Sequence, residues 1–336
     1  MSAYSLLLRH PELFGAGTLF LTDQTPIDGD WLRACQQHNS RIRTWNWLVH
    51  KGAQSLGEDA CRFGLPEPQD LLHCDTVVLL WPKAHEHAQT LLQWLSSQPD
   101  ASSRRYFAVA ANDAGGKSIG KRAQPLCQSV TKIDSARHCT LWQLHLAPSV
   151  GFNWLQPAQS FRWGEHAYLT LPGVFNHGKL DQGTALLLEH LPVPNHGRVL
   201  DLGCGSGVIG LSLKARQAAL DVNLTDIDAF ALRSTELNAM RLGLDVSIYA
   251  SDGLADVTGR FDYLFSNPPF HQGKDTDYRF AQQLFANAQR HLTRQGQLWL
   301  VANRHLAYEE WAAEHFAQVD IVAQGNGFKV LLAQAH

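Results

Sequence analysis

The segment Val199-Leu-Asp-Leu-Gly-Cys-Gly-Ser-Gly207 decides the fold that this sequence predicts. Its first four residues are typical of a buried strand, and the glycines at 203, 205 and 207 indicate a turn into a helix. Glycines let the backbone approach a ligand without side-chain clashes, and the free amides at the start of the next helix favour a polar group there. The segment therefore predicts a nucleotide-like cofactor at a strand–helix junction, with a plain tight turn as the alternative.

Carboxylates near this loop favour one class of cofactor. Residues 205–210 also match G-x-G-x-x-G, which alone is a weak sign of a dinucleotide. Asp201, however, is placed to meet an ammonium or sulfonium zwitterion, and Asp226 can accept both hydroxyls of a ribose in either class. Asp252 follows a third predicted strand and can accept from an adenine amine, or can simply cap a helix. The predicted cofactor-binding residues are Asp201, Gly203, Cys204, Gly205, Gly207, Asp226, Ile227, Asp252, Gly253 and Asn267.

A second segment, Phe261-Asp-Tyr-Leu-Phe-Ser-Asn-Pro-Pro-Phe270, predicts a strand that ends in a rigid turn. An amine conjugated to an aromatic ring is a poor nucleophile, because its lone pair is delocalised into the ring. The Asn267 side-chain carbonyl and the Pro268 main-chain carbonyl can grip its two N–H groups, and Phe270 offers a face for stacking. The predicted catalytic residues are Asn267, Pro268, Pro269 and Phe270, with a proline-rich stop after a strand as the alternative. His271 is interpreted as a surface histidine and not as a base.

Together, the two segments predict the transfer of a methyl group from S-adenosylmethionine to a planar nitrogen. The donor is already a cation, so catalysis should rest on the alignment of nitrogen, methyl and sulfur more than on acid–base assistance. A nicotinamide-dependent oxidoreductase is the rival hypothesis, and it offers no role for the Asn-Pro-Pro-Phe tetrad.

Strand and helix patterns alternate along the second half of the chain, as an α/β fold with a parallel, doubly wound sheet requires. Residues 75–83 in the first half resemble residues 262–269, with Trp81-Pro82-Lys83 in place of Asn-Pro-Pro. This self-similarity predicts a duplicated domain whose first copy has lost the glycine loop, although two unrelated α/β domains would also look alike. We expect domains at 1–150 and 161–336, joined by a connection at 147–157. The predicted elements of the second half are strands at 198–202, 221–225, 246–250, 262–266, 297–302, 319–323 and 328–333, and helices at 229–242 and 279–292.

The composition is typical of a protein with two buried cores. The chain has 336 residues, 45% of them hydrophobic, and a net charge of −3. This charge argues against coating nucleic acid through bulk electrostatics, so any polyanion must be met by local patches. The six cysteines include no C-x-x-C pair and are interpreted as buried thiols of a reducing compartment. No basic leader or long apolar span is visible, so we expect a cytoplasmic protein without a metal site.

The chain resembles the small-subunit ribosomal RNA guanine-N(2) methyltransferases of the RsmC type over nearly all of its length. The resemblance implies two tandem class I, Rossmann-like methyltransferase domains, of which only the C-terminal one binds S-adenosylmethionine. The degenerate N-terminal copy would aid folding and RNA binding. The implied reaction methylates the exocyclic N(2) amine of a specific guanine in 16S ribosomal RNA. Besides the glycine loop and Ser266-Asn-Pro-Pro-Phe-His271, the motifs are Leu7-Leu-Arg9, Cys74-Asp-Thr-Val77 with Trp81-Pro82-Lys83, Lys132-Ile-Asp-Ser-Ala-Arg137, Thr170-Leu-Pro-Gly-Val-Phe175 with Leu180-Asp181, and Val301-Ala-Asn303.

Three further features bear on the substrate. The stretch Val301-Ala-Asn-Arg-His-Leu306 looks closer to a sister family that methylates a guanine of large-subunit 23S ribosomal RNA, and this substrate stays an alternative, as does a non-catalytic RNA-binding assembly factor. Phe270 favours guanine, because related enzymes that act on DNA adenine or protein glutamine usually carry tyrosine there. The modest net charge suggests that the substrate is a folded or partly assembled ribosomal particle, here a 30S particle, that offers shape as well as phosphate. We expect the protein to be a monomer. The basic clusters that could contact RNA, or simply be solvated, are Arg41 with Arg43, Arg104 with Arg105, Lys117 with Lys121 and Arg122, and Arg137.

Overall fold

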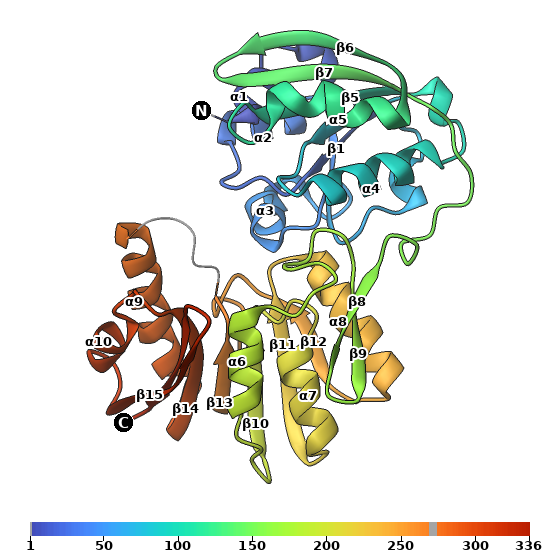
Figure 1. Ribbon diagram of the computed structural model, residues 1–336. Coiled ribbons are helices and arrows are strands. Elements are labelled where there is room, and N and C mark those ends of the chain that lie inside the picture. Colours follow the sequence, from blue (N-terminus) through green and yellow to red (C-terminus); the bar gives the residue numbers. More distant parts are fainter. Residues whose placement is uncertain (1, 269–273) are drawn as a thin grey trace. The chain divides into compact units, whose positions relative to one another are not determined.

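The computed structural model describes residues 2–268 and 274–336, and the chain divides into two compact units, Met1–Pro157 and Ala158–His336. Figure 1 shows that each unit is a sheet flanked by helices. The connection expected at 147–157 is grouped with the first unit.

The sheet of the C-terminal unit has seven strands in the order β12-β11-β10-β13-β14-β16-β15. The first five are parallel neighbours, and β16 pairs antiparallel with both β14 and β15. The strand order reverses at β10, because β11 lies on one side of it and β13 on the other. In open α/β sheets, ligands bind at the carboxyl ends of the strands at such a reversal. The strands are β10 (Gly197–Leu202), β11 (Leu220–Asp226), β12 (Ser247–Ala250), β13 (Phe261–Ser266), β14 (Leu292–Asn303), β15 (Gln318–Gly325) and β16 (Phe328–Gln334).

Local signals explain where the helices of this unit begin and end. The side chain of Asp228 accepts hydrogen bonds from two amides of the first turn of α8, and Gly243 ends that helix in the left-handed conformation. A hairpin, β8 (Gln159–Trp163) with β9 (His166–Thr170), is tied to α8 by Asn238, which bonds both the amide and the carbonyl of Leu169. The helices are α6 (Gln182–His190), α7 (Val208–Arg216), α8 (Ala229–Leu242), α9 (Lys274–His291) and α10 (Tyr308–Ala313).

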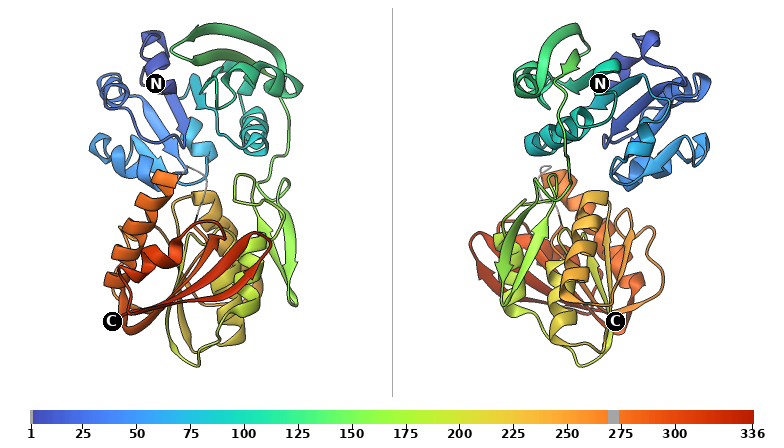
Figure 2. Two further views of the ribbon diagram at one scale, coloured as in Figure 1. Left: turned by 60° about the vertical axis from the view of Figure 1, so that its left-hand side comes forward. Right: turned by 90° about the vertical axis from the view of Figure 1, so that its right-hand side faces the viewer.

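The N-terminal unit repeats this topology strand for strand. Its sheet has the order β3-β2-β1-β4-β5-β7-β6, with β7 antiparallel to β5 and β6. Figure 2 shows β6 and β7 as a long, curved ribbon at one edge of this sheet. The predicted tandem of two Rossmann-like domains is therefore confirmed. The elements are β1 (Thr18–Thr22), β2 (Arg41–Thr44), β3 (Cys61–Phe63), β4 (Thr76–Leu80), β5 (Arg105–Ala111), β6 (Cys127–Ala136), β7 (Cys139–Leu146), α1 (Ala3–Leu7), α2 (Gly29–Gln37), α3 (Trp47–Gly52), α4 (His85–Ser96) and α5 (Ile119–Ala123).

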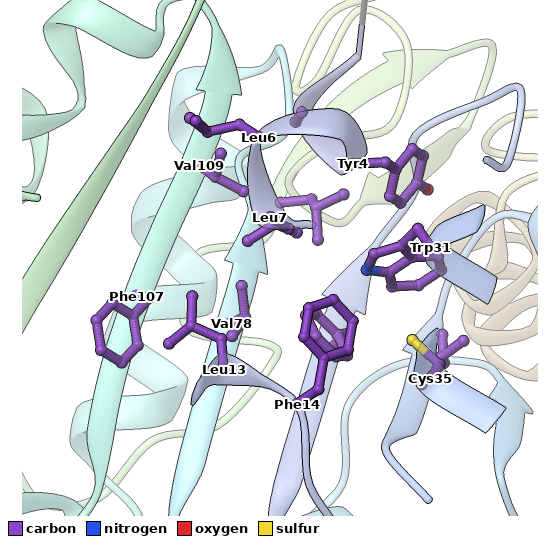
Figure 3. Close-up of a cluster of buried hydrophobic side chains, with 14 of the residues drawn as sticks. Tyr4, Leu6, Leu7, Leu13, Phe14, Trp31, Cys35, Val78, Phe107 and Val109 are labelled. Carbon is purple, nitrogen blue, oxygen red and sulfur yellow. The ribbon is translucent and has the colours of Figure 1, made fainter. Parts of the chain in front are cut away.

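A hydrophobic core joins α1 and α2 to the sheet of the N-terminal unit (Figure 3). The ring of Trp31 lies 4.6 Å from that of Tyr4 and meets Phe20 edge-on at 5.1 Å between ring centroids. All three side chains are fully buried, and burial of a large apolar side chain contributes ~1.5–3 kcal/mol. The first copy has therefore kept a complete core of its own.

The remaining composition-based expectations concern thiols and membranes. All six cysteines are buried and free. Burial raises the pKa of Cys127 to about 11 and that of Cys61 to about 12, so these thiols stay protonated near neutral pH. Of the helices that the structure describes, none combines the length and the apolar character needed to cross a membrane.

Candidate functional site

The glycine loop leaves the carboxyl end of β10 at the point where the strand order reverses. The amides of Gly203 and Cys204 both donate to the carbonyl of Thr225 on the neighbouring β11, at 2.8 and 2.9 Å. Gly203, Gly205 and Gly207 have φ angles of +71°, +56° and +77°, a region that residues with a Cβ rarely adopt. The loop thus turns sharply, and α7 begins directly after Gly207.

The four glycines of this segment have two different surroundings. A Cβ atom placed on Gly203 or Gly205 would meet no heavy atom within 4 Å. A Cβ on Gly207 would lie 2.8 Å from Thr235 Cγ2, and one on Gly210 would lie 2.8 Å from Leu224 Cδ2. Gly207 and Gly210 therefore permit close packing of the loop and α7, whereas Gly203 and Gly205 expose bare backbone to open space, as a closely bound cofactor requires.

Asp226 ties this loop to the end of β11. Its Oδ2 accepts from the amide of Gly205 at 2.9 Å, and its Oδ1 accepts from the amide of Asp228 at 3.0 Å. Burial raises the pKa of this carboxyl above its ordinary value. The side chain remains partly exposed, and so do those of Ile227 and Asp228, which follow it. The carboxylate is thus held next to the open side of the loop, where it can accept from further donors.

Asp201 lies behind the loop and not on its open side. Its side chain is fully buried, and its Oδ2 accepts from the amide of Gly210 in the first turn of α7 at 2.8 Å. Burial, with the nearby charge of Asp226, raises the pKa of Asp201 to about 7. In this arrangement Asp201 supports the start of α7, and its contact with a cofactor zwitterion stays a prediction.

Cys204, Asp252 and Gly253 complete the predicted cofactor residues of the loop edge. The Cys204 thiol is buried and lies 3.4 Å from Thr235 Oγ1, so only the backbone of Cys204 faces the loop. After β12, the amide of Ser251 donates to the carbonyl of Asp226, which places Asp252 beside the end of β11. Gly253 is exposed with a φ of +54°, and the Asp252 amide donates to Asp256 Oδ2 at 3.0 Å. The structure therefore brings the ends of β10, β11 and β12 together at one edge.

Asn267 follows β13 at the same edge. Its Nδ2 donates to Asp181 Oδ2 and to Thr184 Oγ1, both at 2.8 Å. The preceding Ser266 donates from Oγ to the carbonyl of Leu202 at 2.9 Å, which ties β13 to β10. Pro268 is buried, and the predicted residues Pro269, Phe270 and His271 lie outside the described residues. Sequence reasoning missed Thr184, and it noted Asp181 only as part of a motif.

The residues of this edge suit a small cationic ligand with an adenosine part. Asp226 ends β11 and Asp252 follows the adjacent β12, and the bare glycine backbone and the amino end of α7 lie between them and Asn267. A metal would need different groups: within residues 2–268 and 274–336, no three or more His, Cys, Asp or Glu side chains gather closely enough to hold an ion. The chemistry of the edge thus fits S-adenosylmethionine, whose sulfonium is cationic and whose ribose offers two hydroxyl donors.

The corresponding edge of the N-terminal unit is filled by tryptophan. Thr22 of β1 pairs with Thr44 of β2, as Leu202 of β10 pairs with Thr225 of β11, so Trp45 takes the position of Asp226. The pairing of β1 with β4 likewise aligns Trp81 with Asn267.

Both indoles at this edge are buried, with exposures of 0% and 1%. Trp45 Nε1 donates to Asp23 Oδ2 at 3.2 Å, and Asp23 stands where the C-terminal copy has Gly203. A cofactor would therefore meet large side chains where the C-terminal unit offers open space.

The basic clusters differ in their surroundings. Arg43 is only 4% exposed. Its Nε and Nη2 both donate to the carboxylate of Asp70, which is buried as well. The expectation that Arg43 contacts RNA was therefore wrong. Three other arginines donate to neighbouring protein oxygens: Arg41 to the Leu72 carbonyl, Arg104 to the Cys74 carbonyl and Arg105 to Thr76 Oγ1.

The third cluster is different, because it lies beside an aromatic side chain: Trp142 Nε1 donates to the carbonyl of Gly116, which precedes Lys117. Trp142 of β7 lines a hollow of about 410 Å³ together with Lys121 and Pro125. Lys132 is paired directly opposite Trp142 across the β6–β7 ladder. Within the described part of the chain, Lys117, Lys121, Arg122 and Lys132 have no carboxylate oxygen within 4.0 Å. We call Lys117, Lys121, Arg122, Lys132 and Trp142 the basic groove.

Comparison with known proteins identifies the family. The family model described as "Methyltransferase small domain" matches residues 165–332, and "Methyltransferase small domain N-terminal" matches residues 5–157. Ribosomal RNA small subunit methyltransferase C of Pseudomonas syringae pv. syringae is 37% identical over 98% of both chains, and that of Mannheimia succiniciproducens is 35% identical over 97% of this chain and 96% of its own. The fold matches a T. thermophilus 16S rRNA N2 methyltransferase (RsmC), solved in complex with AdoMet and guanosine, with a TM-score of 0.77 over 99% of this chain and 92% of that chain, at 24% identity. The chain therefore belongs to the ribosomal RNA small subunit methyltransferase C family.

Proposed function

We propose that this protein transfers a methyl group from S-adenosylmethionine to the exocyclic N(2) amine of a specific guanine in 16S ribosomal RNA. Asn267 carries this proposal, because both hydrogens of its amide nitrogen are bonded within the protein. Its Oδ1 has no donor among the residues that the structure describes and can accept from an amine beside the open glycines. The names of the relatives support a small-subunit substrate over a guanine of 23S ribosomal RNA. A nicotinamide-dependent oxidoreductase would give Asn267 no task.

The proposed mechanism rests on alignment. When bound, S-adenosylmethionine supplies a methyl group on a cationic sulfur. The Oδ1 of Asn267 and the main-chain carbonyl of Pro268 accept from the two N–H groups of the guanine amine and aim its lone pair at that methyl group. The guanine nitrogen forms its new bond to carbon as the carbon–sulfur bond breaks, and one N–H proton then passes to water. Stacking of the base on Phe270 stays a prediction.

The residues at the loop edge would hold the cofactor. Asp226 accepts from the ribose hydroxyls, with Ile227 beside it, and Asp252 and Gly253 border the adenine. Gly203, Cys204 and Gly205 present backbone to the methionine part, and Asp201 fixes the start of α7 behind them. Gly207 allows α7 to pack closely against Thr235, and its contact with the cofactor stays a prediction. This division of roles is supported by the two kinds of glycine surroundings described above.

We further propose that the basic groove binds the RNA substrate, and that this substrate is part of a partly assembled 30S particle. The cations of the groove have no carboxylate partner among the described residues, and phosphate groups supply the opposite charge. Trp142 offers an aromatic surface on which an unpaired base can stack, worth ~1–3 kcal/mol.

Asn267→Ala tests the proposed chemistry. We expect this variant to lose methyl transfer to 16S ribosomal RNA, because the target amine loses its acceptor, while its affinity for S-adenosylmethionine stays within about twofold of wild type. Transfer is measured with tritiated S-adenosylmethionine and 30S particles from a strain that lacks this protein, and cofactor affinity by calorimetry. Mass spectrometry of the labelled RNA identifies the nucleoside. A wild-type protein that labels no guanine, or an Asn267→Ala variant that loses the cofactor as well, would contradict the proposal.

A further inference from the structure

The amino end of α6 reaches across to Asn267. Asp181 caps this helix: its Oδ2 accepts from the amide of Thr184 at 2.8 Å, while its Oδ1 accepts from Asn176 Nδ2 at 2.9 Å. The same Oδ2 and the hydroxyl of Thr184 are the two acceptors for Asn267 Nδ2. One short helical turn thus presents two oxygen atoms to a single amide nitrogen.

This pair of acceptors determines which way the Asn267 amide faces. An amide nitrogen carries two hydrogens, and both are used here. If the amide were turned over, Oδ1 would face a carboxylate oxygen, and two acceptors would repel each other. Within residues 2–268 and 274–336 no donor bonds Oδ1 of Asn267, so this atom can receive a ligand, and it can only accept.

Packing holds α6 in the place that this arrangement needs. A Cβ atom on Gly183 would lie 2.7 Å from Val301 Cγ1 and 3.0 Å from Phe328 Cδ1, so the helix start lies directly against β14 and β16. Thr184 is only 7% exposed. The two acceptors are thereby fixed relative to the sheet that carries Asn267.

We propose that Asp181 and Thr184 are positioning residues that orient the Asn267 amide, so that the site takes only an N–H donor such as the guanine amine. The inference rests on the proposed function and adds two residues to it. The carboxylate of Asp181 also places a negative charge one hydrogen bond away from Nδ2 of the same amide. Through the amide, this charge favours the positive charge that develops on the nitrogen during transfer.

Thr184→Val tests the inference, because valine keeps the shape of threonine and removes its oxygen. With one hydrogen bond to the amide lost, we expect kcat to fall about tenfold with cofactor affinity unchanged. Thr184→Ser keeps the oxygen and should restore kcat. Asp181→Asn removes the charge and should also lower kcat. Asp28→Asn is the matched control, since Asp28 caps α2 in the same way but lies in the N-terminal unit.

Combination with Asn267→Ala separates orientation from other roles. If Thr184 acts through Asn267, Thr184→Val should change neither the residual transfer rate nor the guanosine affinity of the Asn267→Ala protein. An undiminished kcat in Thr184→Val, a loss confined to cofactor affinity, or an effect that adds fully to Asn267→Ala would overturn the inference.

Hydrogen exchange of the Asn267 side-chain amide can be measured without methyl transfer, so this test is independent of the test of the proposed function. The Asn267 side-chain amide signal, assigned by its absence in Asn267→Ala, should exchange its hydrogens slowly in wild type and faster in Thr184→Val. Equal exchange would contradict the orienting role even in a protein with no transfer activity. Protected exchange without any methylation of RNA would contradict only the proposed function.

Discussion

At the scale of single residues, the glycines of the loop have two different roles, exposure of the backbone to a ligand and close packing against α8. Their surroundings show which glycine has which role. Gly205 and Gly207 share the left-handed conformation, so alanine at either position costs ~1–2 kcal/mol of stability. At Gly207 the new methyl group would also press on Thr235, whereas at Gly205 it would enter open space. This difference makes the two positions a matched pair.

We expect Gly207→Ala to lower the melting temperature more than Gly205→Ala does, because only the former adds a clash. Gly205→Ala should lower S-adenosylmethionine affinity at least about tenfold, because its methyl group would occupy space proposed for the cofactor. Thermal unfolding and calorimetric titration measure the two effects. Equal melting temperatures, or wild-type affinity in Gly205→Ala, would show that the open side is not the ligand side.

The buried carboxyl of Asp201 should make stability depend on pH. Its pKa is about 7 in the folded protein and about 3.9 in an unfolded chain, so the folded state binds the proton more tightly. The resulting stabilisation is fully present below about pH 4 and is lost as the pH rises through 7, by on the order of 4 kcal/mol. Asp201→Asn cannot titrate.

We therefore expect the cofactor-free wild type to lose stability between pH 5 and pH 8, relative to the Asp201→Asn protein. Urea unfolding at several pH values measures the difference, and the salt concentration is held constant. If the free energy of unfolding changed with pH in the same way in both proteins, Asp201 would not titrate in this range, and the expectation would be wrong.

At the scale of elements, the basic groove is formed by α5 with the short turn Gly116–Ser118 before it, and by β6 and β7. Lys117→Ala with Lys121→Ala removes two cations of the groove, of which Lys121 lines the hollow together with Trp142. We expect weaker binding of 16S ribosomal RNA and a log–log salt slope smaller by ~1.4, since each phosphate contact to a single strand contributes ~0.7. Filter binding over a series of salt concentrations measures both.

The control for this experiment is Arg216→Ala with Arg241→Ala. These residues are exposed in the last turns of α7 and α8, and their substitution removes the same charge from the C-terminal unit. An equal loss of RNA affinity in the two double variants would reduce the role of the groove to bulk charge. Unchanged binding in the lysine variant would remove the groove from the RNA interface.

At the scale of the whole molecule, the duplication predicts unequal copies. Trp45 and Trp81 fill the positions that correspond to Asp226 and Asn267, so the cofactor edge is closed by buried indoles in the N-terminal unit and has open glycine backbone in the C-terminal unit. We expect calorimetric titration of the full chain to give one S-adenosylmethionine per protein. A fragment of residues 158–336 should keep this binding but methylate RNA poorly, because it lacks the basic groove. A stoichiometry of two, or full activity of the well-folded fragment, would contradict this division.

The sequence by itself determined most of the fold. Hydrophobic periodicity and helix-capping residues are local signals, so the predicted helix at 229–242 has the same bounds as α8. The seven strands predicted in the second half are all present. The glycine loop and Asn267 could be assigned to one sheet edge, because parallel strands bring their carboxyl ends together. Polar helix starts are harder to predict, and the helix expected from 279 begins at Lys274.

Only the tertiary structure decided which polar groups meet. Asp181 and Thr184 lie more than 80 residues from Asn267, and their hydrogen bonds depend on the packing of α6 against β14 and β16. Arg43 reads as a surface cation in the sequence, yet the fold buries it against Asp70. Asp201 is a predicted ligand contact, and the fold adds a bond from the amide of Gly210 that the sequence does not indicate. The type and spacing of residues along a chain indicate which interactions a side chain can make. Whether that side chain is buried, and which group it bonds, depends on contacts between segments that are distant in the sequence.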